Sequence, residues 1–335
     1  MKGSKKPVAL LLVNLGTPEE LSTASVRRFL REFLSDPRVV EIPRLIWWLI
    51  LNCFVLTFRP KKVVETYRQV WWPEGSPLRV ITERQSAALQ RTLQNRFGEG
   101  RVSVRYAMTY GDPGISESLE ELYQSGHRRI VVLPLYPQYS GSTTGAIYDQ
   151  IAQFMQAQRA LPGLSIINSY FQEESYISAL QQSIENYWQK EGKPDHLLFS
   201  YHGIPVSYVE KGDPYQGHCE CTTAAVLDGL EIGGVSTHMS YQSLFGKAEW
   251  LKPYTSELLK QLATQGAGRV DVICPGFAAD CIETLEEIAI ENAEIFQEAG
   301  GKELRLIPCL NDSDFHIEAL ADIAERHLRA ISPDN

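Results

Sequence analysis

Short apolar runs bounded by turn residues alternate along this chain with amphipathic segments of helical periodicity. This alternation predicts parallel sheets with helices on both faces, because parallel neighbours need a crossover connection. The predicted strands cover residues 8–13, 102–108, 129–136, 164–169, 196–201, 235–241, 270–275 and 303–308. The predicted helices cover residues 24–34, 83–97, 115–125, 144–158, 174–189, 253–264, 280–298 and 315–330. Four strands in each half predict two related α/β lobes rather than one large sheet.

The chain has 335 residues, which exceeds the usual size of one domain. We expect an N-terminal lobe at 1–172, a C-terminal lobe at 173–312, and a C-terminal helix and tail at 313–335. Residues Lys2–Lys6 precede the apolar run Val8–Val13 and resemble a signal peptide. That run is short and has no small-residue cleavage site after it, so a buried first strand is the better interpretation.

The net charge of −9 and the lack of a large basic tract argue against a nucleic-acid partner. A negative chain attracts a cation more readily than an anion. The cysteines are scattered, which fits neither a dense disulfide framework nor a paired zinc site and favours a reducing cytoplasm. They stand at positions 53, 219, 221, 274, 281 and 309.

Residues 45–58 are almost wholly apolar and are followed by the basic flank Arg59–Lys62. The run is too short to span a bilayer. One interpretation is a buried core helix. The other is an exposed apolar lip, suited to a membrane interface or to a flat apolar ligand.

Parallel sheets bind ligands at the carboxyl ends of their strands, which selects the turns 14–18, 136–145, 202–205, 242–246 and 276–283. None of them carries a Gly-rich dinucleotide or P-loop fingerprint, and this counts against a nucleotide enzyme. His202 ends a predicted strand, and Gly203 and Pro205 turn the chain after it. A lone histidine is most often structural, but neutral imidazole at a strand tip can ligate Fe2+ or accept a proton.

The segment after Cys274 combines a helix start with acidic residues. Asp280 and Glu283 have the spacing of a capping box, which is a sufficient structural account of both. That account does not cover Glu287 and Glu291, which continue from Glu283 at spacings of four. Such a row is most often a solvated face, although like charges at this spacing destabilise a helix by about 0.2–0.5 kcal/mol each. Next to His202, the row would form a path for a divalent cation.

The segment Tyr136–Gly145 places two tyrosines and several hydroxyls at the end of another strand. The hydroxyls of residues 142–144 have a simple role as helix caps. Together with the tyrosines they also form an amphipathic wall that could stack on a flat aromatic ligand.

Over nearly its full length the chain resembles the ferrochelatase family, on motifs that occur in family order. These motifs are Asn14–Pro18, Phe33–Asp36, Gly75–Leu78, Tyr136–Gly145, Ser200–Pro205, Gly212–Tyr215, Tyr241–Ser243, Trp250–Pro253 and Pro275–Ile288. The resemblance implies a chelatase-like fold of two Rossmann-like lobes, each a four-stranded parallel sheet flanked by helices. It also implies a porphyrin cleft between the lobes and an apolar lip at about 43–60. The implied activity is that of a lyase that inserts Fe2+ into protoporphyrin IX, forming protohaem and releasing two protons in the final step of haem biosynthesis.

The resemblance assigns the catalytic pair and the metal site to residues of the C-terminal lobe. His202 and Glu283 are the implied catalytic residues, and the implied metal-binding residues are His202, Glu283, Glu287 and Glu291. The implied porphyrin contacts are Leu15, Tyr67, Tyr136, Ser140, Tyr241 and Phe277. Which residue of the catalytic pair holds the metal and which takes the proton stays open.

Departures from the family pattern narrow these expectations. Leu15 stands where relatives that act on coproporphyrin have tyrosine, which favours protoporphyrin IX. Gly141 replaces a cysteine of cluster-bearing relatives and the tail after Cys309 has none, so no iron–sulfur cluster and no permanent cofactor is expected. Thr109 and Leu244 replace arginines, and Cys281 replaces a histidine of some relatives.

The expected location is the cytoplasm, with peripheral contact at the inner face of the membrane through residues 45–58. Two other functions use the same residues. A cobalt or nickel chelatase would act on another tetrapyrrole. A haem or metal carrier would bind tightly without converting free porphyrin.

Overall fold

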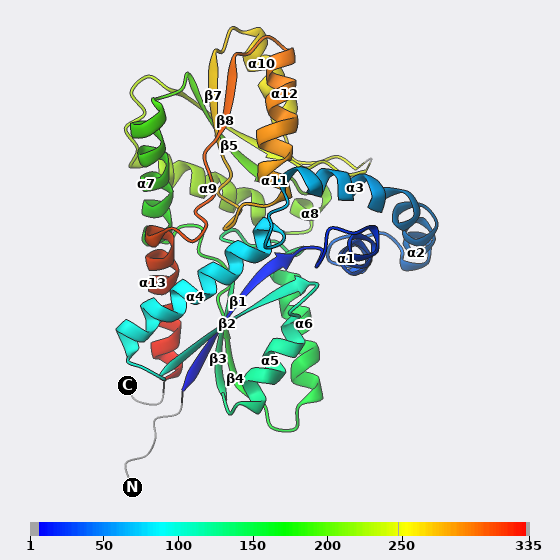
Figure 1. Ribbon diagram of the computed structural model, residues 1–335, viewed down its shortest axis with the longest axis vertical. Coiled ribbons are helices and arrows are strands. Elements are labelled where there is room, and N and C mark those ends of the chain that lie inside the picture. The colour runs from blue at the N-terminus through cyan, green and yellow to red at the C-terminus, as the bar shows by residue number, and fades with distance from the viewer. Residues whose placement is uncertain (1–6, 247, 333–335) are drawn as a thin grey trace. The chain divides into compact units, whose positions relative to one another are not determined.

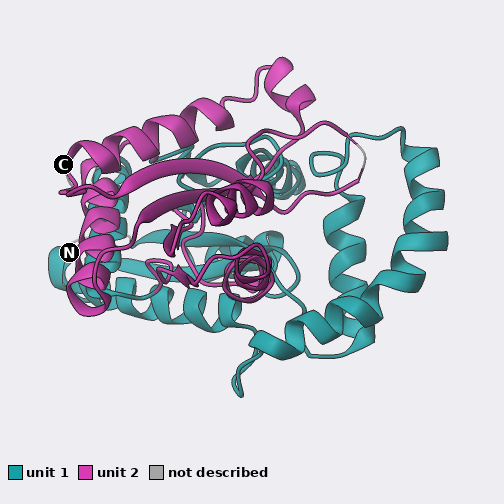
Figure 2. Ribbon diagram, turned by 90° about the horizontal axis from the view of Figure 1, so that it is seen from above, with its two compact units in different colours: residues 1–170, 312–335 teal, residues 171–311 magenta. Residues whose placement is uncertain are grey.

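The computed structural model describes residues 7–246 and 248–332, and it divides into two compact units (Figure 2). Unit 1 comprises residues 1–170 and 312–335, and unit 2 comprises residues 171–311. Residues Lys2–Lys6, which resemble a leader, lie outside the described residues, as does the end of the predicted C-terminal tail at 333–335.

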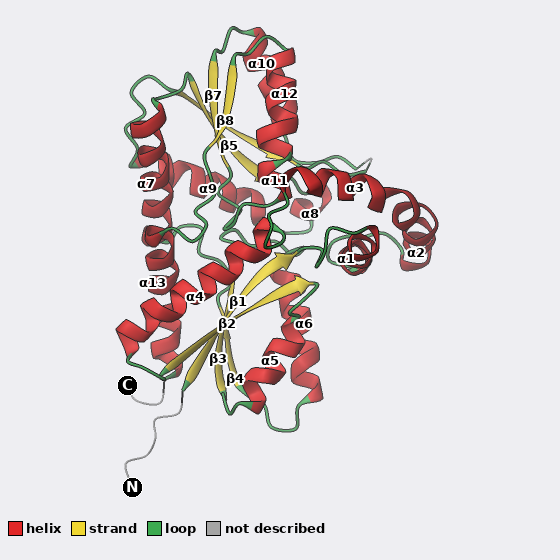
Figure 3. Ribbon diagram, viewed as in Figure 1, coloured by secondary structure: helices red, strands yellow, loops and turns green. Residues whose placement is uncertain are grey.

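Unit 1 is built on a four-stranded parallel sheet with the strand order β2-β1-β3-β4 (Figures 1 and 3). Its strands are β1 (Val8–Gly16), β2 (Val102–Tyr110), β3 (Arg129–Pro134) and β4 (Gly163–Ile166). Its helical segments are α1 (Thr23–Ser35), α2 (Arg44–Ile50), η1 (Leu51–Val55), α3 (Leu56–Val70), α4 (Pro77–Phe97), α5 (Ile115–Gln124), α6 (Thr144–Ala157) and α13 (Asp314–Ile331).

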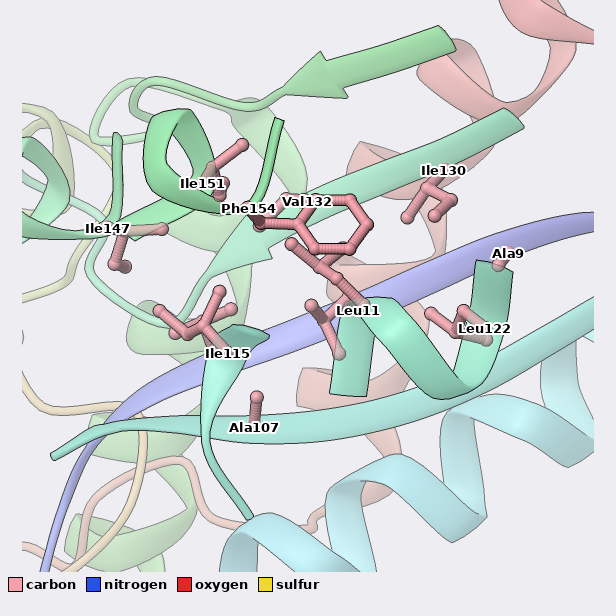
Figure 4. Packing of buried hydrophobic residues seen from close by; sticks show 12 residues of the cluster. Ala9, Leu11, Ala107, Ile115, Leu122, Ile130, Val132, Ile147, Ile151 and Phe154 are labelled. Carbon is pink, nitrogen blue, oxygen red and sulfur yellow. The ribbon is translucent and has the colours of Figure 1, made fainter. Parts of the chain in front are cut away.

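The two faces of this sheet are covered because its strands are apolar on both sides. Figure 4 shows one face, where Leu11 and Val132 of the sheet pack against α5 and α6 through residues such as Ile115 and Phe154. Helices α4 and α13 contact the strands on the other side. β1 pairs with β2 on one side and with β3 on the other, and almost all of its residues are buried. Its carboxyl end therefore has a fixed position in the sheet.

Unit 2 repeats this architecture with the strand order β6-β5-β7-β8, again fully parallel. Its strands are β5 (His196–His202), β6 (Ser236–Gln242), β7 (Arg269–Ile273) and β8 (Glu303–Leu306). Its helical segments are α7 (Glu174–Glu191), α8 (Val206–Glu210), α9 (Tyr215–Asp228), α10 (Thr255–Thr264), α11 (Ile282–Leu285), η2 (Glu287–Asn292) and α12 (Ala293–Glu298). The prediction of two lobes, each with a four-stranded parallel sheet flanked by helices, is confirmed.

One face of the second sheet packs on α10 and α12 in a core that includes Leu198, Leu259 and Phe296. The side chains of β5 alternate between faces, so His196, Ser200 and His202 lie on the same side of the strand as Leu198. The opposite face meets α7 and α9. There the Trp188 indole donates to buried Asp271 of β7 at 2.9 Å.

Two helices belong to a different unit from the strand that precedes them. α7 follows β4 of unit 1 but belongs to unit 2, whereas α13 follows β8 of unit 2 and belongs to unit 1. Arg96 of α4 fastens α13 by ion pairs to Glu318, Asp322 and Glu325. The C-terminal helix is therefore an integral part of unit 1.

The apolar run at 45–58 forms α2, η1 and the start of α3, in a helical arm at the side of unit 1 (Figure 1). The interpretation as a buried core helix is wrong, because Leu45, Trp48, Phe54 and Phe58 are each more than half exposed. Only a few residues of the run, such as Trp47, face inward, where its indole donates to the Leu34 carbonyl at 2.6 Å. No helix of the described residues is long and apolar enough to cross a membrane.

Candidate active site

His202 is the last residue of β5, and its half-buried imidazole is oriented by the backbone. Nδ1 lies 2.7 Å from the Gly203 carbonyl and must carry the proton in that bond, because a carbonyl only accepts. In the neutral ring Nε2 then keeps its lone pair for a metal or a proton. A Cβ on Gly203 would lie 3.0 Å from the Gln242 carbonyl oxygen, so the turn leaves little room for a side chain there.

The acidic segment begins one residue later than its sequence predicts. The cap of α11 is Cys281, whose backbone N–H donates to the Thr284 hydroxyl at 3.0 Å. The predicted capping box of Asp280 and Glu283 is therefore wrong. Asp280 is buried instead, and it accepts hydrogen bonds from Thr284 and from the Asn311 amide at 2.6 Å. This leaves the Glu283 carboxyl free of a capping role.

The predicted continuous helix at 280–298 is interrupted by the π-helical segment η2. The Glu291 N–H donates to the Glu286 carbonyl at 2.9 Å, five residues earlier, and the Asn292 amide satisfies the Glu287 carbonyl at 2.7 Å. A π turn contains more residues than an α turn, so side chains four residues apart no longer lie on one face of the helix. Glu287 and Glu291 are both within η2. Glu283 and Glu287 are half-buried, and Glu291 is exposed. Single π turns inside helices are frequent at functional sites.

Glu287 is held by residues at the end of β6. The Ser243 N–H donates to one carboxyl oxygen at 2.6 Å and the Ser243 hydroxyl donates to the other. Ser243 has a φ of 64°, in the left-handed region that is uncommon for a residue with a side chain, and this lets both of its donors reach Glu287. Burial raises the pKa of Glu287 despite these bonds and the opposing effect of His202.

Two of the other predicted metal residues, His202 and Glu283, act electrostatically on Glu287. Positive charge on His202 favours ionisation of Glu287, and negative charge on Glu283 opposes it. Among residues 7–246 and 248–332, no three His, Cys, Asp or Glu side chains lie close enough to hold a metal by themselves. His202, Glu283 and Glu287 provide an imidazole nitrogen and carboxylate oxygens, which are ligand types that suit a divalent cation.

Three buried thiols surround Asp280 in the same region. Burial raises the pKa of Cys274, Cys281 and Cys309, so the thiols stay protonated near neutral pH. The Cys281 thiol is also hydrogen-bonded to the Glu283 side chain. Sequence reasoning missed this contact, as well as the roles of Gln242 and Ser243. The signal in the sequence was the position of Gln242 and Ser243 at the predicted end of a strand, in the segment 242–246.

The porphyrin residues expected in unit 1 differ in accessibility. Leu15 is the second-last residue of β1 and is half-buried, as is Tyr136, which follows β3. Tyr67 and Ser140 are buried, Tyr67 with its ring edge-on to Trp71 at 5.7 Å between centroids. The Ser140 hydroxyl is 3.0 Å from that of Ser142. Leu15 and Tyr136 therefore present more surface to a ligand than the other two.

The two porphyrin residues expected in unit 2 also differ. Tyr241 stands near the end of β6 and is only 1% exposed. Phe277 is half-buried and packs against the core beside α10 and α12, in the turn between β7 and α11. Its backbone N–H donates to the Cys274 carbonyl at 3.1 Å. Of this pair, Phe277 is the residue with surface available.

Solved structures of other proteins share this two-unit fold. SirB from Bacillus subtilis with Fe3+ matches with a TM-score of 0.57 at 10% identity and covers 96% of both chains. CbiX, described as the terminal enzyme for biosynthesis of siroheme in denitrifying bacteria, matches with a TM-score of 0.51 at 11% identity, covering 95% of this chain and 98% of its own. Two parallel α/β units of this kind are therefore the fold of the chelatases.

Within this class, the ferrochelatase family model matches residues 7–328. A ferrochelatase of Acinetobacter baumannii is 47% identical over 99% of this chain and 98% of its own length. Those of Thioalkalivibrio sulfidiphilus and Photobacterium profundum are each 48% identical, over 98% and 95% of this chain and 88% and 97% of their own. The chain belongs to the ferrochelatase family, whose members are lyases that insert iron into a porphyrin in haem biosynthesis. The rival chelatase and carrier functions are not favoured.

Proposed function

We propose that the porphyrin is protoporphyrin IX and that His202 is the first acceptor of the two pyrrole protons. The observation that carries this proposal is the His202 ring itself. Its Nδ1–H is committed to the Gly203 carbonyl, so a neutral ring has a basic Nε2 at the strand end. A neutral imidazole can take a pyrrole proton through Nε2 and return it to solvent.

Fe2+ enters along the carboxylates of Glu291, Glu287 and Glu283 and reaches the ring beside His202. The two donors of Ser243 support this, because its N–H and hydroxyl hold the Glu287 carboxylate in place for a cation. Imidazole and carboxylate ligands suit Fe2+. Glu283 orients His202 or relays its proton, and the same pair serves metal and proton in sequence.

A bent porphyrin supplies the remaining ligands. Distortion of the ring exposes pyrrole lone pairs on one face, at a cost of a few kcal/mol that is met from binding energy elsewhere. The porphyrin contacts of Leu15, Tyr67, Tyr136, Ser140, Tyr241 and Phe277 remain predictions, as does the cleft between the two units. The choice of protoporphyrin IX rests on Leu15, a half-buried apolar residue at the end of β1.

The test is anaerobic incubation of the protein with Fe2+ and either protoporphyrin IX or coproporphyrin III, followed by absorbance. We expect conversion of protoporphyrin IX to haem at a kcat/KM well above that for the more polar porphyrin. A preference for coproporphyrin would overturn the substrate assignment. The variant Leu15→Tyr introduces the residue that coproporphyrin-acting relatives have. It should shift the ratio of the two kcat/KM values toward coproporphyrin III.

No permanent cofactor is part of this proposal. The thiols of Cys219 and Cys221 are two residues apart on α9, and two thiols do not complete a four-ligand cluster. Iron analysis of the purified protein, together with its visible spectrum, should show no stoichiometric iron and no cluster bands.

Membrane contact through the helical arm is a further part of the proposal, together with a cytoplasmic location. The exposed Leu45, Trp48, Phe54 and Phe58 supply an apolar face, and Arg59, Lys61 and Lys62 supply positive charge beside it. Co-sedimentation with vesicles should increase with their anionic lipid content. The variant Trp48→Ser/Phe54→Ser should bind them less, and equal binding would remove this part of the proposal.

A further inference from the structure

Gln242 is the last residue of β6 and is only 2% exposed. Its amide nitrogen donates to the Glu283 carbonyl at 2.7 Å and to the Glu287 carboxyl at 3.3 Å. One side chain therefore contacts both the backbone of the first acidic residue and the carboxylate of the second. Neither contact is part of a helix or a sheet.

The orientation of this amide is determined by its neighbours. Its oxygen accepts from the Ser200 hydroxyl at 2.7 Å and from the Cys274 thiol at 3.6 Å. In the flipped orientation that oxygen would face the carbonyl of Glu283 and the carboxylate of Glu287, both of which are acceptors. The donor must therefore face the acidic segment.

A buried hydroxyl cluster supports Ser200 from behind. The Thr255 hydroxyl at the start of α10 lies 3.0 Å from that of Ser200 and 2.9 Å from that of Ser240. All three residues are at most 1% exposed. Buried polar groups keep one orientation when each has a hydrogen-bond partner. The cluster therefore keeps the Ser200 hydroxyl, and through it the Gln242 amide, in position.

We propose that Gln242 is a positioning residue for iron insertion, which fixes the Glu287 carboxylate and the junction of α11 with η2. The proposal rests on the proposed role of Glu287 in handling iron. Ser243 holds Glu287 from the loop, and Gln242 holds both the carboxylate and the Glu283 backbone from the sheet. Gln242 touches neither substrate in this scheme and acts only through these acidic residues.

The first variant is Gln242→Leu, which keeps the volume of the side chain and removes its donor and acceptor. We expect the apparent KM for Fe2+ to rise by roughly 2- to 10-fold, the range of one to two net hydrogen bonds, with kcat and the KM for porphyrin close to wild type. Hydrogen exchange of the full-length protein should accelerate in peptides that cover residues 282–292. Ser200→Ala removes the hydrogen bond to the Gln242 amide oxygen but leaves the amide itself in place. It should raise the KM for Fe2+ by a smaller factor.

The matched control is Thr255→Val, which removes the hydrogen bonds to Ser200 and Ser240 but no hydrogen bond of Gln242. It should lower the melting temperature, but change the KM for Fe2+ and the exchange of residues 282–292 far less than Gln242→Leu does, because Ser200 still donates to the amide oxygen. A merely structural role of Gln242 predicts instead that the two variants behave alike. That result would overturn the proposal.

A double-mutant cycle with Glu287→Gln separates this inference from the proposed function. If Gln242 acts through Glu287, Gln242→Leu adds little to the KM of the Glu287→Gln variant. Full multiplication of the two effects would overturn the positioning role. An unchanged KM in Glu287→Gln alone would instead overturn the iron role of Glu287. Unaltered exchange of residues 282–292 in Gln242→Leu would overturn the positioning role whatever the kinetics show.

Discussion

The central strands of the two units, β1 and β5, end in the same way but carry different chemistry. Both occupy the second place in a sheet of the same order. β1 runs into Leu15-Gly16-Thr17-Pro18 and β5 into His202-Gly203-Ile204-Pro205. In each turn the glycine lies against the end of the edge strand, with Gly16 beside Tyr110 and Gly203 beside Gln242. Leu15 thus holds in unit 1 the place that His202 holds in unit 2.

The surroundings of the two strand ends differ in charge. Near the end of β1 the partners are neutral, since the Asn14 amide donates to the Thr82 hydroxyl at 2.9 Å and the Thr17 hydroxyl to that of Ser76 at 2.8 Å. Near the end of β5 stand Glu283 and Glu287. The same turn geometry therefore holds an apolar residue, Leu15, in one unit and an imidazole, His202, in the other. The chemistry of each strand end is decided by that residue and its neighbours.

Replacing the histidine is the most direct way to break this comparison. His202→Ala should lower kcat by about 10²- to 10⁴-fold, the usual contribution of a positioned general base, because no other imidazole takes its place. Porphyrin binding, followed by fluorescence, and the far-UV spectrum should remain those of the wild type.

His196→Ala is the control for that variant, since His196 is half-buried on the same face of the same strand and contacts His238 at 3.1 Å. It should retain wild-type turnover. Near-normal turnover in His202→Ala would contradict the assignment of the proton acceptor.

The two units should also differ in what their buried ion pairs contribute to stability. Asp271 of unit 2 is fully buried and accepts from Arg305 at 2.7 Å, whereas Arg96 of unit 1 meets its three acidic partners at a partly exposed site. Arg305→Met leaves a buried carboxylate unpaired and should cost about 3–5 kcal/mol in the free energy of unfolding. Arg96→Met should cost about 1 kcal/mol. Urea denaturation measures both, and equal costs would contradict the contrast.

The two turn glycines offer a sharper contrast. A Cβ on Gly16, where φ is 111°, would lie 1.7 Å from the Tyr110 carbonyl oxygen, but one on Gly203 would lie 3.0 Å from that of Gln242. Gly16→Ala should therefore cost about 1–3 kcal/mol from the backbone conformation alone, with the clash in addition. Gly203→Ala should cost less, because a shift of a few tenths of an ångström relieves it. Thermal unfolding would detect a reversed order.

The smallest effect is expected from Glu287→Gln, which keeps an acceptor for Ser243. The apparent KM for Fe2+ should rise several-fold, in the range that one charge-assisted contact supplies, with kcat little changed. An unchanged KM would count against the acidic row as an entry path.

The same variant tests the raised pKa of Glu287. A carboxyl whose pKa is higher in the folded than in the unfolded state stabilises the fold at low pH and loses that contribution as the pH rises. Glu287→Gln should therefore be more stable than wild type at neutral pH. The gain should shrink as the pH falls toward the ordinary pKa of Glu, which denaturation at several pH values would show.

Much of this protein could be read from local patterns. Apolar runs and turn residues predicted every strand, because a buried parallel strand needs a continuous apolar run whatever its neighbours are. The positions of His202 and Glu283 followed from the rule that ligands bind at the carboxyl ends of parallel strands. The apolar run at 45–58 was visible too, but the sequence alone could not say whether it was buried.

Contacts between distant segments decided the rest. Glu287 is placed by Gln242 and Ser243, more than forty residues earlier in the chain. The π turn of η2 and the exchange of α7 and α13 between units depend on packing that no local pattern records. The sequence by itself determined where the strands form and which residues stand near their ends, because hydrophobic period acts within a few residues, whereas it left α3, α8 and α9 without a predicted helix. Only the tertiary structure decided which side chains meet there, because hydrogen bonds and burial depend on partners that folding brings together.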